Sequence, residues 1–204
     1  NFKEVLRKSD IVFCCLPHTE AMDTVAQFYQ AGKIVIDLSA DFRLKDPKVY
    51  KNWYHHRHTR KNLLREAVYG LPEIYRREIQ NANLIANPGC YATGSILGLK
   101  PLIEKDLIEC DGIVVDAKSG VSGAGRKITP GTFFGEVHEN FKAYKVNQHQ
   151  HMPEISMVLK DLARSEVKFS FVPHLLPIDR GILCTIYARK KKGLSRKNLL
   201  KACA

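Results

Sequence analysis

Short apolar segments alternate with helical segments over the first ninety residues, and this alternation limits the possible folds more than any other feature. Three segments are apolar almost throughout and have the length of strands: residues 10–16, 33–38 and a short stretch near residue 82. Residues 19–31 have a helical pattern, as do the residues up to about Lys8. Such strands, separated by amphipathic helices, are typical of a parallel sheet covered on both faces. We therefore expect residues 1–89 to form the later part of a doubly wound α/β domain.

The pattern changes close to residue 90. A helix is expected at residues 91–106, followed by a strand at 111–118, a helix at 153–164 and strands at 167–173 and 181–190. The last two strands alternate apolar and polar residues, as strands with one covered face do, and we expect them to form an antiparallel pair. Residues 90–204 are therefore predicted to form an α+β domain.

Composition excludes some classes of protein. With 45% hydrophobic residues among 204, the chain has enough apolar material for a sizeable core. No apolar stretch approaches the roughly 20 residues that span a bilayer, so we expect no membrane partner. The six cysteines show no repeating spacing, and Cys14 and Cys15 are adjacent, which is poor disulfide geometry. We therefore expect a reducing, cytoplasmic location.

The net charge of +11 is concentrated in two basic clusters, at residues 50–65 and 188–201. A basic surface attracts anions, which include nucleic acid, phosphorylated metabolites and phosphate-bearing cofactors. The first cluster mixes aromatic and basic residues, as single-strand binders do. A nucleic-acid-binding module is therefore one alternative, and a solvated surface without a ligand is another.

Residues 86–96, "ANPGCYATGSI", place a cysteine between a Pro-Gly turn and a helix that is expected to begin at Tyr91 without a good side-chain cap. A thiol at this junction faces backbone N–H groups and the positive end of the helix dipole, which favour the thiolate. The same N–H groups could stabilise an oxyanion. Cys90 is therefore a candidate nucleophile, the alternative being an inert buried cysteine.

The eight histidines are the candidates for its proton partner. The three histidines of the first basic cluster, His55, His56 and His58, are expected at the surface. Two others, His138 and His174, have no distinguishing context. His149 and His151 lie just before Pro153, on residues expected to be extended. Since alternate residues of an extended segment point the same way, both imidazoles are expected to face one cleft, unless they are simply polar loop residues.

A glycine-rich loop follows the strand at 111–118. Its sequence, "SGVSGAGRK" at residues 119–127, would let backbone amides approach a phosphate or a nicotinamide ring. It lacks the spacing of the dinucleotide fingerprint and of the P-loop, and neither motif occurs elsewhere in the chain. Arg43 and Arg180 lie at junctions suited to a bidentate grip on phosphate or carboxylate, although each alone could be a surface ion-pair residue. No C-x-x-C occurs and the H-x-H pair lacks a third ligand at a familiar spacing, so no metal site is expected.

At this point the residues resemble a known family. "IANPGCYATGSILGLKP" is similar to the active-site signature of the N-acetyl-gamma-glutamyl-phosphate reductases of arginine biosynthesis, which are related to aspartate-semialdehyde dehydrogenases. Six further motifs follow the family's order: "LPH", "DLSADFR", "YGLPE", "SGVSGAGR", "HQHMPEI" and "PHLLPIDRGIL". The resemblance covers essentially the whole chain.

The resemblance implies a role for each motif. Cys90 would be the nucleophile and His149 its acid/base partner, an imidazole expected to titrate near neutrality. The substrate's anionic groups would be held by His151, Arg43 and Arg180. The nicotinamide end of NADP(H) would be lined by Leu16, Pro17, His18, Ser119, Gly120, Ser122 and Gly123.

The reaction implied is the NADPH-dependent reduction of an acyl phosphate through a thioester on Cys90 to the semialdehyde. A sister reductase acting on an aminoadipyl phosphate in lysine biosynthesis is the alternative substrate assignment. The resemblance also implies a homo-oligomer, a dimer or tetramer, built through the sheet of the second domain.

The chain departs from the family's pattern at both ends. It lacks the glycine-rich phosphate-binding loop after the first strand of the cofactor domain and the segment that completes that domain. Residues 1–89 are therefore expected to be the C-terminal part of a Rossmann-type NADP-binding domain, and residues 90–204 a C-terminally truncated catalytic and dimerisation domain. Because a pyrophosphate would lack its helix N-terminus, we expect this chain alone to bind NADP(H) poorly and to show little activity.

Overall fold

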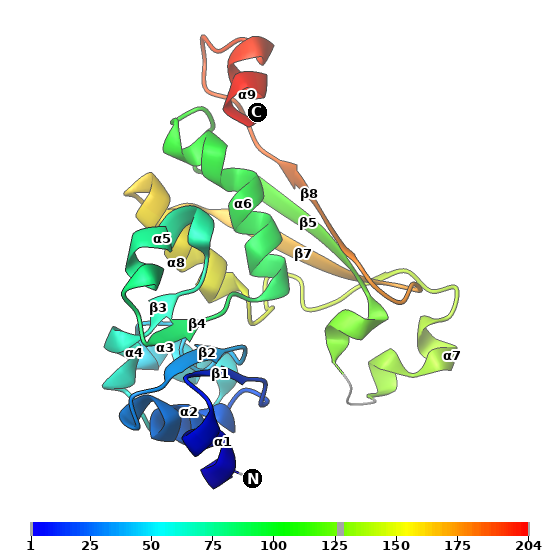
Figure 1. Ribbon diagram of the computed structural model, residues 1–204. Helices are drawn as coiled ribbons and strands as arrows, with labels where there is room; N and C mark the ends of the chain where they lie inside the picture. Colours follow the sequence, from blue (N-terminus) through cyan, green and yellow to red (C-terminus); the bar gives the residue numbers. More distant parts are fainter. Residues whose placement is uncertain (1, 126–128, 204) are drawn as a thin grey trace. The chain divides into compact units, whose positions relative to one another are not determined.

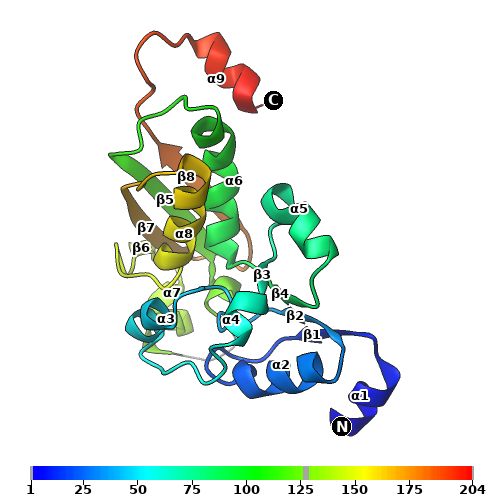
Figure 2. The ribbon, with the colours of Figure 1, turned by 90° about the vertical axis from the view of Figure 1, so that its left-hand side faces the viewer.

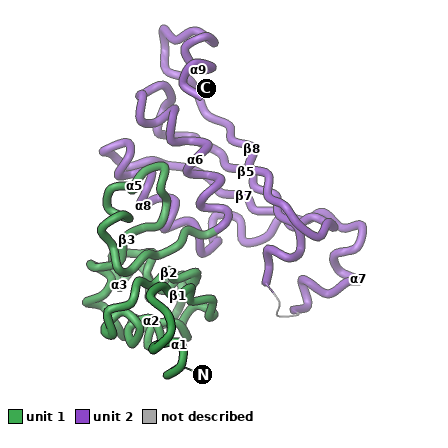
Figure 3. The backbone as a smooth tube through the Cα atoms, viewed as in Figure 1, with its two compact units in different colours: residues 1–89 green, residues 90–204 purple. Residues whose placement is uncertain are grey.

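The computed structural model describes residues 2–125 and 129–203. The chain divides into two compact units, residues 1–89 (unit 1) and residues 90–204 (unit 2), which Figure 3 shows in different colours. Within the described residues, each unit contains one four-stranded sheet. No described helix combines the length and the apolar character that crossing a membrane requires.

Unit 1 alternates helices and strands along the chain (Figure 1). Its strands are β1 (Ile11–Cys14), β2 (Ile34–Asp37), β3 (Val68–Tyr69) and β4 (Leu84–Ala86). Its helices are α1 (Phe2–Lys8), α2 (Ala21–Gln30), α3 (Pro47–Tyr54), α4 (Leu63–Glu66) and α5 (Pro72–Gln80). The strands lie in the order β1-β2-β4-β3 and all neighbours are parallel, which confirms the expected α/β sheet.

The core of unit 1 lies between this sheet and its helices. Val35 of β2 and Leu84 of β4 are completely buried, and Val25 of α2 belongs to the same apolar cluster. On β1 only alternate residues are buried, and Ile11 and Phe13 are 51% and 65% exposed. The expectation of a sheet covered on both faces is therefore wrong for β1, since its outward-facing side chains Ile11 and Phe13 are exposed.

The sequence analysis did not identify α3, α4, β3 or α5. A local signal for α3 was present, since the Asp46 side chain accepts a hydrogen bond from the backbone N–H of Lys48 at 2.7 Å and Pro47 occupies the first turn. An aspartate cap followed by proline is a common way to begin a helix.

Unit 2 combines a mixed sheet with helices. Its strands are β5 (Ile113–Gly120), β6 (Lys142–Ala143), β7 (Phe169–Leu176) and β8 (Ile182–Tyr187). Its α-helices are α6 (Cys90–Glu104), α7 (Phe134–Val137), α8 (Met152–Ala163) and α9 (Arg196–Cys203), with short 3₁₀ helices at Val121–Ala124 and Pro130–Thr132. This arrangement confirms the predicted α+β class.

The strand order of unit 2 differs from the expected antiparallel pair of its last two strands. The order is β6-β7-β5-β8, with β5 parallel to β7 and antiparallel to β8. β7 and β8 follow one another in the chain but lie on opposite sides of β5. The prediction was wrong because alternation shows that a strand has one covered face but does not show which strand lies beside it.

Helices α6 and α8 cover one face of the unit 2 sheet, as Figure 2 shows. Two glycines let β8 approach α6 closely: a Cβ at Gly94 would lie 3.0 Å from Sγ of Cys184, and one at Gly98 would lie 2.8 Å from Cδ1 of Ile186. Residues paired in register share a face, so the opposite face carries Asp116, Lys118, His174, Leu183 and Tyr187.

Candidate active site

Cys90 is the first residue of α6, one residue before the expected helix start. Its side chain is exposed, whereas Pro88 and Gly89 before it are buried. The first N–H groups of an α-helix have no acceptor within the helix, and this end carries a partial positive charge. An exposed thiol at this place can meet a substrate and is favoured as the thiolate.

His149 packs against the residue that follows Cys90. Its imidazole lies edge-on to the Tyr91 ring, with the ring centroids 5.5 Å apart. Phe171 of β7 and Tyr144 also contact it, with centroids 5.5 Å and 5.8 Å away. These three aromatic residues form a box that holds the candidate proton partner beside the start of α6. The sequence analysis did not identify them, although Tyr91 lies within the cysteine motif itself.

His149 and His151 lie together, with ring centroids 4.7 Å apart. The backbone differs from the expected extended segment, because the N–H of Met152 donates to the His149 carbonyl at 2.9 Å and closes a turn. The backbone N–H of His151 donates to Nδ1 of His149 at 3.1 Å. A turn, rather than the alternation of a strand, therefore brings the two imidazoles together.

The same hydrogen bond determines which nitrogen of His149 carries the proton. Because Nδ1 accepts a hydrogen bond, the neutral ring carries its proton on Nε2. Burial lowers the pKa of His149 to about 3, and the charges of His151 and Lys145 act in the same direction. The expectation of titration near neutrality therefore does not hold, because partial burial of the ring in the aromatic box disfavours its charged form. At neutral pH His149 is uncharged and offers an Nε2–H donor.

The glycine-rich loop is joined to the turn that carries Arg180. A Cβ at Gly120 would lie 2.7 Å from the backbone nitrogen of Arg180, so only glycine allows this approach. At Gly123, a Cβ would lie 2.3 Å from Oγ of Ser119. Ser122 and the exposed Arg180 line one hollow of about 550 Å³. The structure thus brings together two predicted site segments that lie far apart in the sequence.

The amides of this loop were expected to bind a ligand, but several of them already have partners within the protein. The N–H groups of Gly120, Val121 and Ser122 donate to the carbonyls of Gly181, Ile178 and Asp179 at 2.9–3.0 Å. A donor that is satisfied within the protein gains little from a phosphate oxygen. Within residues 119–125, the predicted cradle therefore serves mainly to join two loops; Arg126 and Lys127 lie outside the described residues.

Leu16, Pro17 and His18 are exposed and follow the carboxyl end of β1, where ligands of parallel sheets bind. The next residue, Thr19, has a positive φ of 72°, which costs energy for a residue other than glycine. Its N–H donates to Oδ1 of the buried Asp41 at 2.7 Å.

Two tyrosines, Tyr50 and Tyr54, contact the residues that hold the loop at residues 16–19. The Tyr50 hydroxyl donates to the same Asp41 oxygen at 2.5 Å. Tyr54 stacks on Tyr50 with ring centroids 4.7 Å apart, and the His18 ring lies edge-on to Tyr54 at 5.4 Å. The loop conformation is therefore held by buried partners that the sequence analysis did not identify.

Two polar residues of unit 1 are buried, and for one of them, His58, the predicted surface position is wrong. Arg43 is only 7% exposed, and its Nε and Nη2 donate to the carbonyls of Asn87 and Leu38 at 2.8 Å and 3.0 Å. This placement favours a structural role, connecting the ends of β2 and β4, over substrate binding. His58 was expected at the surface but is 1% exposed, because its ring packs against Phe42 and Tyr50.

Among residues 2–125 and 129–203, no group of three or more His, Cys, Asp or Glu side chains is arranged to hold a metal ion. The candidate site described above therefore consists of a thiol, imidazoles, a guanidinium and backbone groups.

Comparisons with known proteins identify the two domains of this chain. The model of the semialdehyde dehydrogenase NAD-binding domain matches residues 2–82, and that of the semialdehyde dehydrogenase dimerisation domain matches residues 90–204. Among solved structures, aspartate semialdehyde dehydrogenase II from Vibrio cholerae superposes with a TM-score of 0.69 at 15% identity, over 97% of this chain and 60% of that one. An aspartate semialdehyde dehydrogenase with NADP from Candida albicans gives 0.61 at 17% identity, over 97% of this chain and 55% of that one. At these identities the likeness concerns the fold.

Curated relatives are closer in sequence. The N-acetyl-gamma-glutamyl-phosphate reductase of Pelotomaculum thermopropionicum is 53% identical over 93% of this chain and 54% of the relative. The enzyme of the same name from Clostridium novyi is 50% identical over 99% of this chain and 59% of the relative. The chain thus spans a little over half the length of these relatives. Because the dimerisation-domain model alone matches more than half of its residues, the chain belongs to the semialdehyde dehydrogenase family.

Proposed function

We propose that this chain carries the reactive centre of an NADPH-dependent reductase that converts N-acetyl-gamma-glutamyl phosphate to its semialdehyde. The observation that carries the proposal is the packing of His149 against Tyr91, next to Cys90 at the start of α6. The names of relatives at 50–53% identity support this substrate over the aminoadipyl phosphate and over a nucleic-acid ligand.

The first half of the proposed reaction is an acyl transfer. The Cys90 thiolate attacks the acyl carbon, a C–S bond forms, and the C–O bond to phosphate breaks with its electron pair leaving on phosphate, which takes up one proton. The product is a thioester on Cys90. N–H groups at the start of α6 stabilise the oxyanion of the tetrahedral intermediate.

The second half is a reduction. NADPH, when bound, supplies the hydride that reduces the thioester carbon. His149 donates its Nε2–H as a hydrogen bond to the oxygen on which charge develops. When the carbonyl re-forms, the C–S bond breaks and Cys90 leaves as the thiolate, which releases the aldehyde and restores the starting state.

Binding residues are proposed on the same basis. The exposed segment Leu16–His18, at the carboxyl end of a parallel strand, fits the nicotinamide end of NADP(H). Arg180 and His151 are proposed to hold the substrate's anionic groups. Ser119, Gly120, Ser122 and Gly123 are proposed to shape the neighbouring wall, because most of their amides are already used within the protein.

The thiol chemistry can be tested on this chain by alkylation. Cys15 and Cys203 are exposed as Cys90 is, but neither begins a helix, so they are internal controls. With limiting iodoacetamide at neutral pH, peptide mass spectrometry is expected to show Cys90 labelled at least about tenfold faster than either control. Equal rates at the three thiols would contradict an activated Cys90.

The reaction itself is tested in the full-length reductase by phosphate-dependent NADP⁺ reduction with N-acetylglutamate semialdehyde. Cys90→Ser is expected to lower kcat by about a thousandfold or more, because the serine hydroxyl is a far weaker nucleophile. Cys110→Ser, a half-buried thiol outside the site, is the control and should retain activity. Turnover of aminoadipate semialdehyde in preference to the glutamate compound would move the assignment to the sister reductase.

We also propose that unit 2 forms a homodimer, or a dimer within a tetramer, through the sheet face that α6 and α8 leave open. On this face Leu183 and Tyr187 are 63% and 57% exposed. The match to a dimerisation domain supports the assignment. Leu183→Asp is expected to convert the dimer to a monomer in sedimentation velocity, whereas Leu200→Asp, an equally exposed leucine on α9, is expected to leave it intact.

A cytoplasmic location is proposed for the enzyme, since a nucleophilic thiol must remain reduced and the relatives named above are bacterial. Recovery of the enzyme in the cytosolic fraction of the source cells tests this assignment, and recovery with periplasm or an organelle would contradict it.

A further inference from the structure

The first basic cluster, residues 50–65, contains a hollow that has no part in the proposed reaction. Its volume is about 600 Å³, and it is lined by Gln30 at the end of α2 and by residues 57–63 after α3. Pockets of about 300–1,000 Å³ are the usual size for small-molecule ligands. None of the proposed catalytic or cofactor residues lines this hollow.

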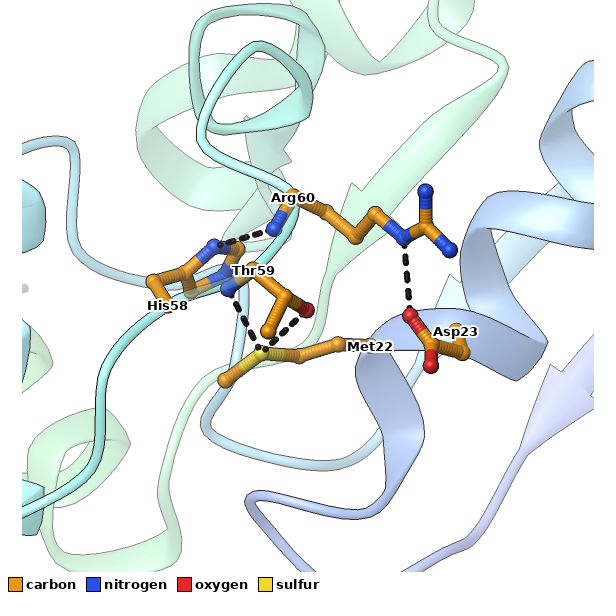
Figure 4. A network of polar contacts seen from close by, with 5 residues as sticks. All are labelled: Met22, Asp23, His58, Thr59 and Arg60. Atoms are coloured by element: carbon orange, nitrogen blue, oxygen red, sulfur yellow. Dashed lines mark hydrogen bonds and ion pairs between the residues drawn. The ribbon is translucent and has the colours of Figure 1, made fainter.

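The wall of the hollow is fixed at three consecutive residues, as Figure 4 shows. The N–H of Arg60 donates to Nδ1 of His58 at 3.2 Å, and His58 itself is buried. The N–H and hydroxyl of Thr59 contact Sδ of Met22 at 3.4 Å and 3.5 Å. Nε of Arg60 pairs with Asp23 at 2.8 Å. The loop is therefore held against α2 rather than freely mobile.

Arg57 and Lys61 lie on either side of this fixed stretch, and unlike Arg60 they have no acidic partner among the described residues. Both side chains are exposed and line the hollow. Within the part of the chain that the structure describes, neither side chain forms an ion pair or a hydrogen bond, whereas the charge of Arg60 is matched by Asp23. Gln30 and Asn62 add amide donors to the same lining. The hollow thus presents two unmatched positive charges on a fixed backbone.

We propose that this hollow binds a phosphate-bearing small molecule. A guanidinium and an ammonium group recognise phosphate oxygens through charge-assisted hydrogen bonds, and neighbouring amides can complete the set. The fixed backbone lowers the entropy cost of bringing these groups together. The volume exceeds what a single phosphate needs, so the expected class is a diphosphate or a phosphorylated metabolite.

The test uses this chain and pyrophosphate as the probe, by isothermal titration calorimetry in about 0.15 M salt, where long-range attraction is screened. The variant Arg57→Gln/Lys61→Gln is expected to weaken binding at least about tenfold, since two charged contacts are lost. The variant Arg76→Gln/Arg77→Gln removes the same charge from two exposed positions of α5 and is expected to bind as the parent does.

The outcomes separate a site from general attraction. Equal weakening by both double variants, or no pyrophosphate binding by the parent, would overturn the proposal. A short single-stranded oligonucleotide in competition distinguishes the source of the phosphate. If the oligonucleotide binds the hollow more tightly than pyrophosphate does, at equal concentration of phosphate groups, the proposal of a small molecule is rejected in favour of a nucleic-acid backbone. Loss of reductase activity in Cys90→Ser has no bearing on this result, because the hollow shares no residue with the reaction.

Discussion

Two histidines, His58 in unit 1 and His149 in unit 2, are held in closely similar ways. In each case the backbone N–H two residues later donates to Nδ1, at 3.2 Å and 3.1 Å. Each ring lies edge-on to a tyrosine, with centroids 5.2 Å apart for His58 and Tyr50 and 5.5 Å for His149 and Tyr91. In each case burial lowers the pKa. Both neutral rings therefore carry the proton on Nε2.

The two rings differ at Nε2. For His58 this nitrogen lies 2.8 Å from the carbonyl oxygen of Asp41, which accepts its hydrogen bond. For His149, no residue among those described accepts a hydrogen bond from Nε2. The same local arrangement thus holds a structural imidazole in unit 1 and, in the proposed reaction, a reactive imidazole in unit 2. The two sites differ in one acceptor, and under the proposed function an oxygen of the substrate would take that place at His149.

The largest effect is expected from His149→Asn in the full-length reductase. Loss of the Nε2–H donor should lower kcat by about 10²–10⁴-fold. Steady-state kinetics measure this loss. His138→Asn, at an exposed position, is the matched control. An equal loss in both variants would remove the distinction between the two kinds of histidine.

His58→Ala is expected to act on stability instead. It leaves the Asp41 carbonyl and the Arg60 N–H without their partner and opens a cavity, so the free energy of unfolding should fall by about 2–4 kcal/mol. Urea titration of this chain measures the change. His56→Ala, at an exposed position of the same loop, should cost less than about 0.5 kcal/mol. Similar costs for both would show that the buried contacts of His58 contribute little.

Both histidines should make the fold sensitive to acid. Their folded pKa lies below the unfolded value of about 6.5, so the unfolded chain binds more protons and stability is lost as pH falls. For His149 the loss extends from about pH 6.5 towards about pH 3, with a slope of up to about 1.4 kcal/mol per pH unit. Between pH 6.5 and 5 the loss is about 1.5 kcal/mol, because the slope reaches its full value only below pH 6.5.

Urea titrations of the parent chain and of His149→Asn at several pH values measure the contribution of His149 to this pH dependence. The variant is expected to show a shallower decrease of stability on acidification. An unchanged slope would mean that His149 has a similar pKa in the folded and unfolded states, contrary to its burial.

The smallest effect is expected from Tyr91→Phe. This change removes the hydroxyl that donates to the His174 carbonyl at 3.0 Å but keeps the ring that packs on His149. The free energy of unfolding should fall by about 1 kcal/mol, with the pH slope of His149 retained. If the pH slope disappears in urea titrations of this variant, the hydroxyl rather than the ring maintains the burial of His149.

Local patterns predicted much of this molecule. Strands β1, β2 and β4 of unit 1 and the junction at Cys90 depend on residues close in the sequence, and the predictions for them agree with the structure to within a few residues. The placement of β5 between β7 and β8 could not be predicted in this way, because strand neighbours are chosen by packing between distant segments.

In the candidate site, too, features set by nearby residues could be predicted, whereas features set by packing between distant segments could not. Cys90 and the His149–His151 pair were identifiable from the residues and from the family resemblance. The aromatic box was not, since Tyr91, Tyr144 and Phe171 come from three separate segments. Nor was the burial of Arg43, because a guanidinium at a loop junction has the same sequence signal whether it faces a substrate or two carbonyls.

The central place of β5 has a consequence for the order of events during synthesis. β5 pairs on both sides with strands that are made some fifty or more residues later, so the sheet of unit 2 cannot close until β7 and β8 have left the ribosome. Phe171, which lies on β7, completes the box around His149 only then. The four described strands of unit 1 all precede residue 90, so they can pair with one another before β7 and β8 are made. We therefore expect a stage of synthesis at which Cys90 is already present while His149 is still solvated, so that the proposed catalytic pair forms only after β7 has been added.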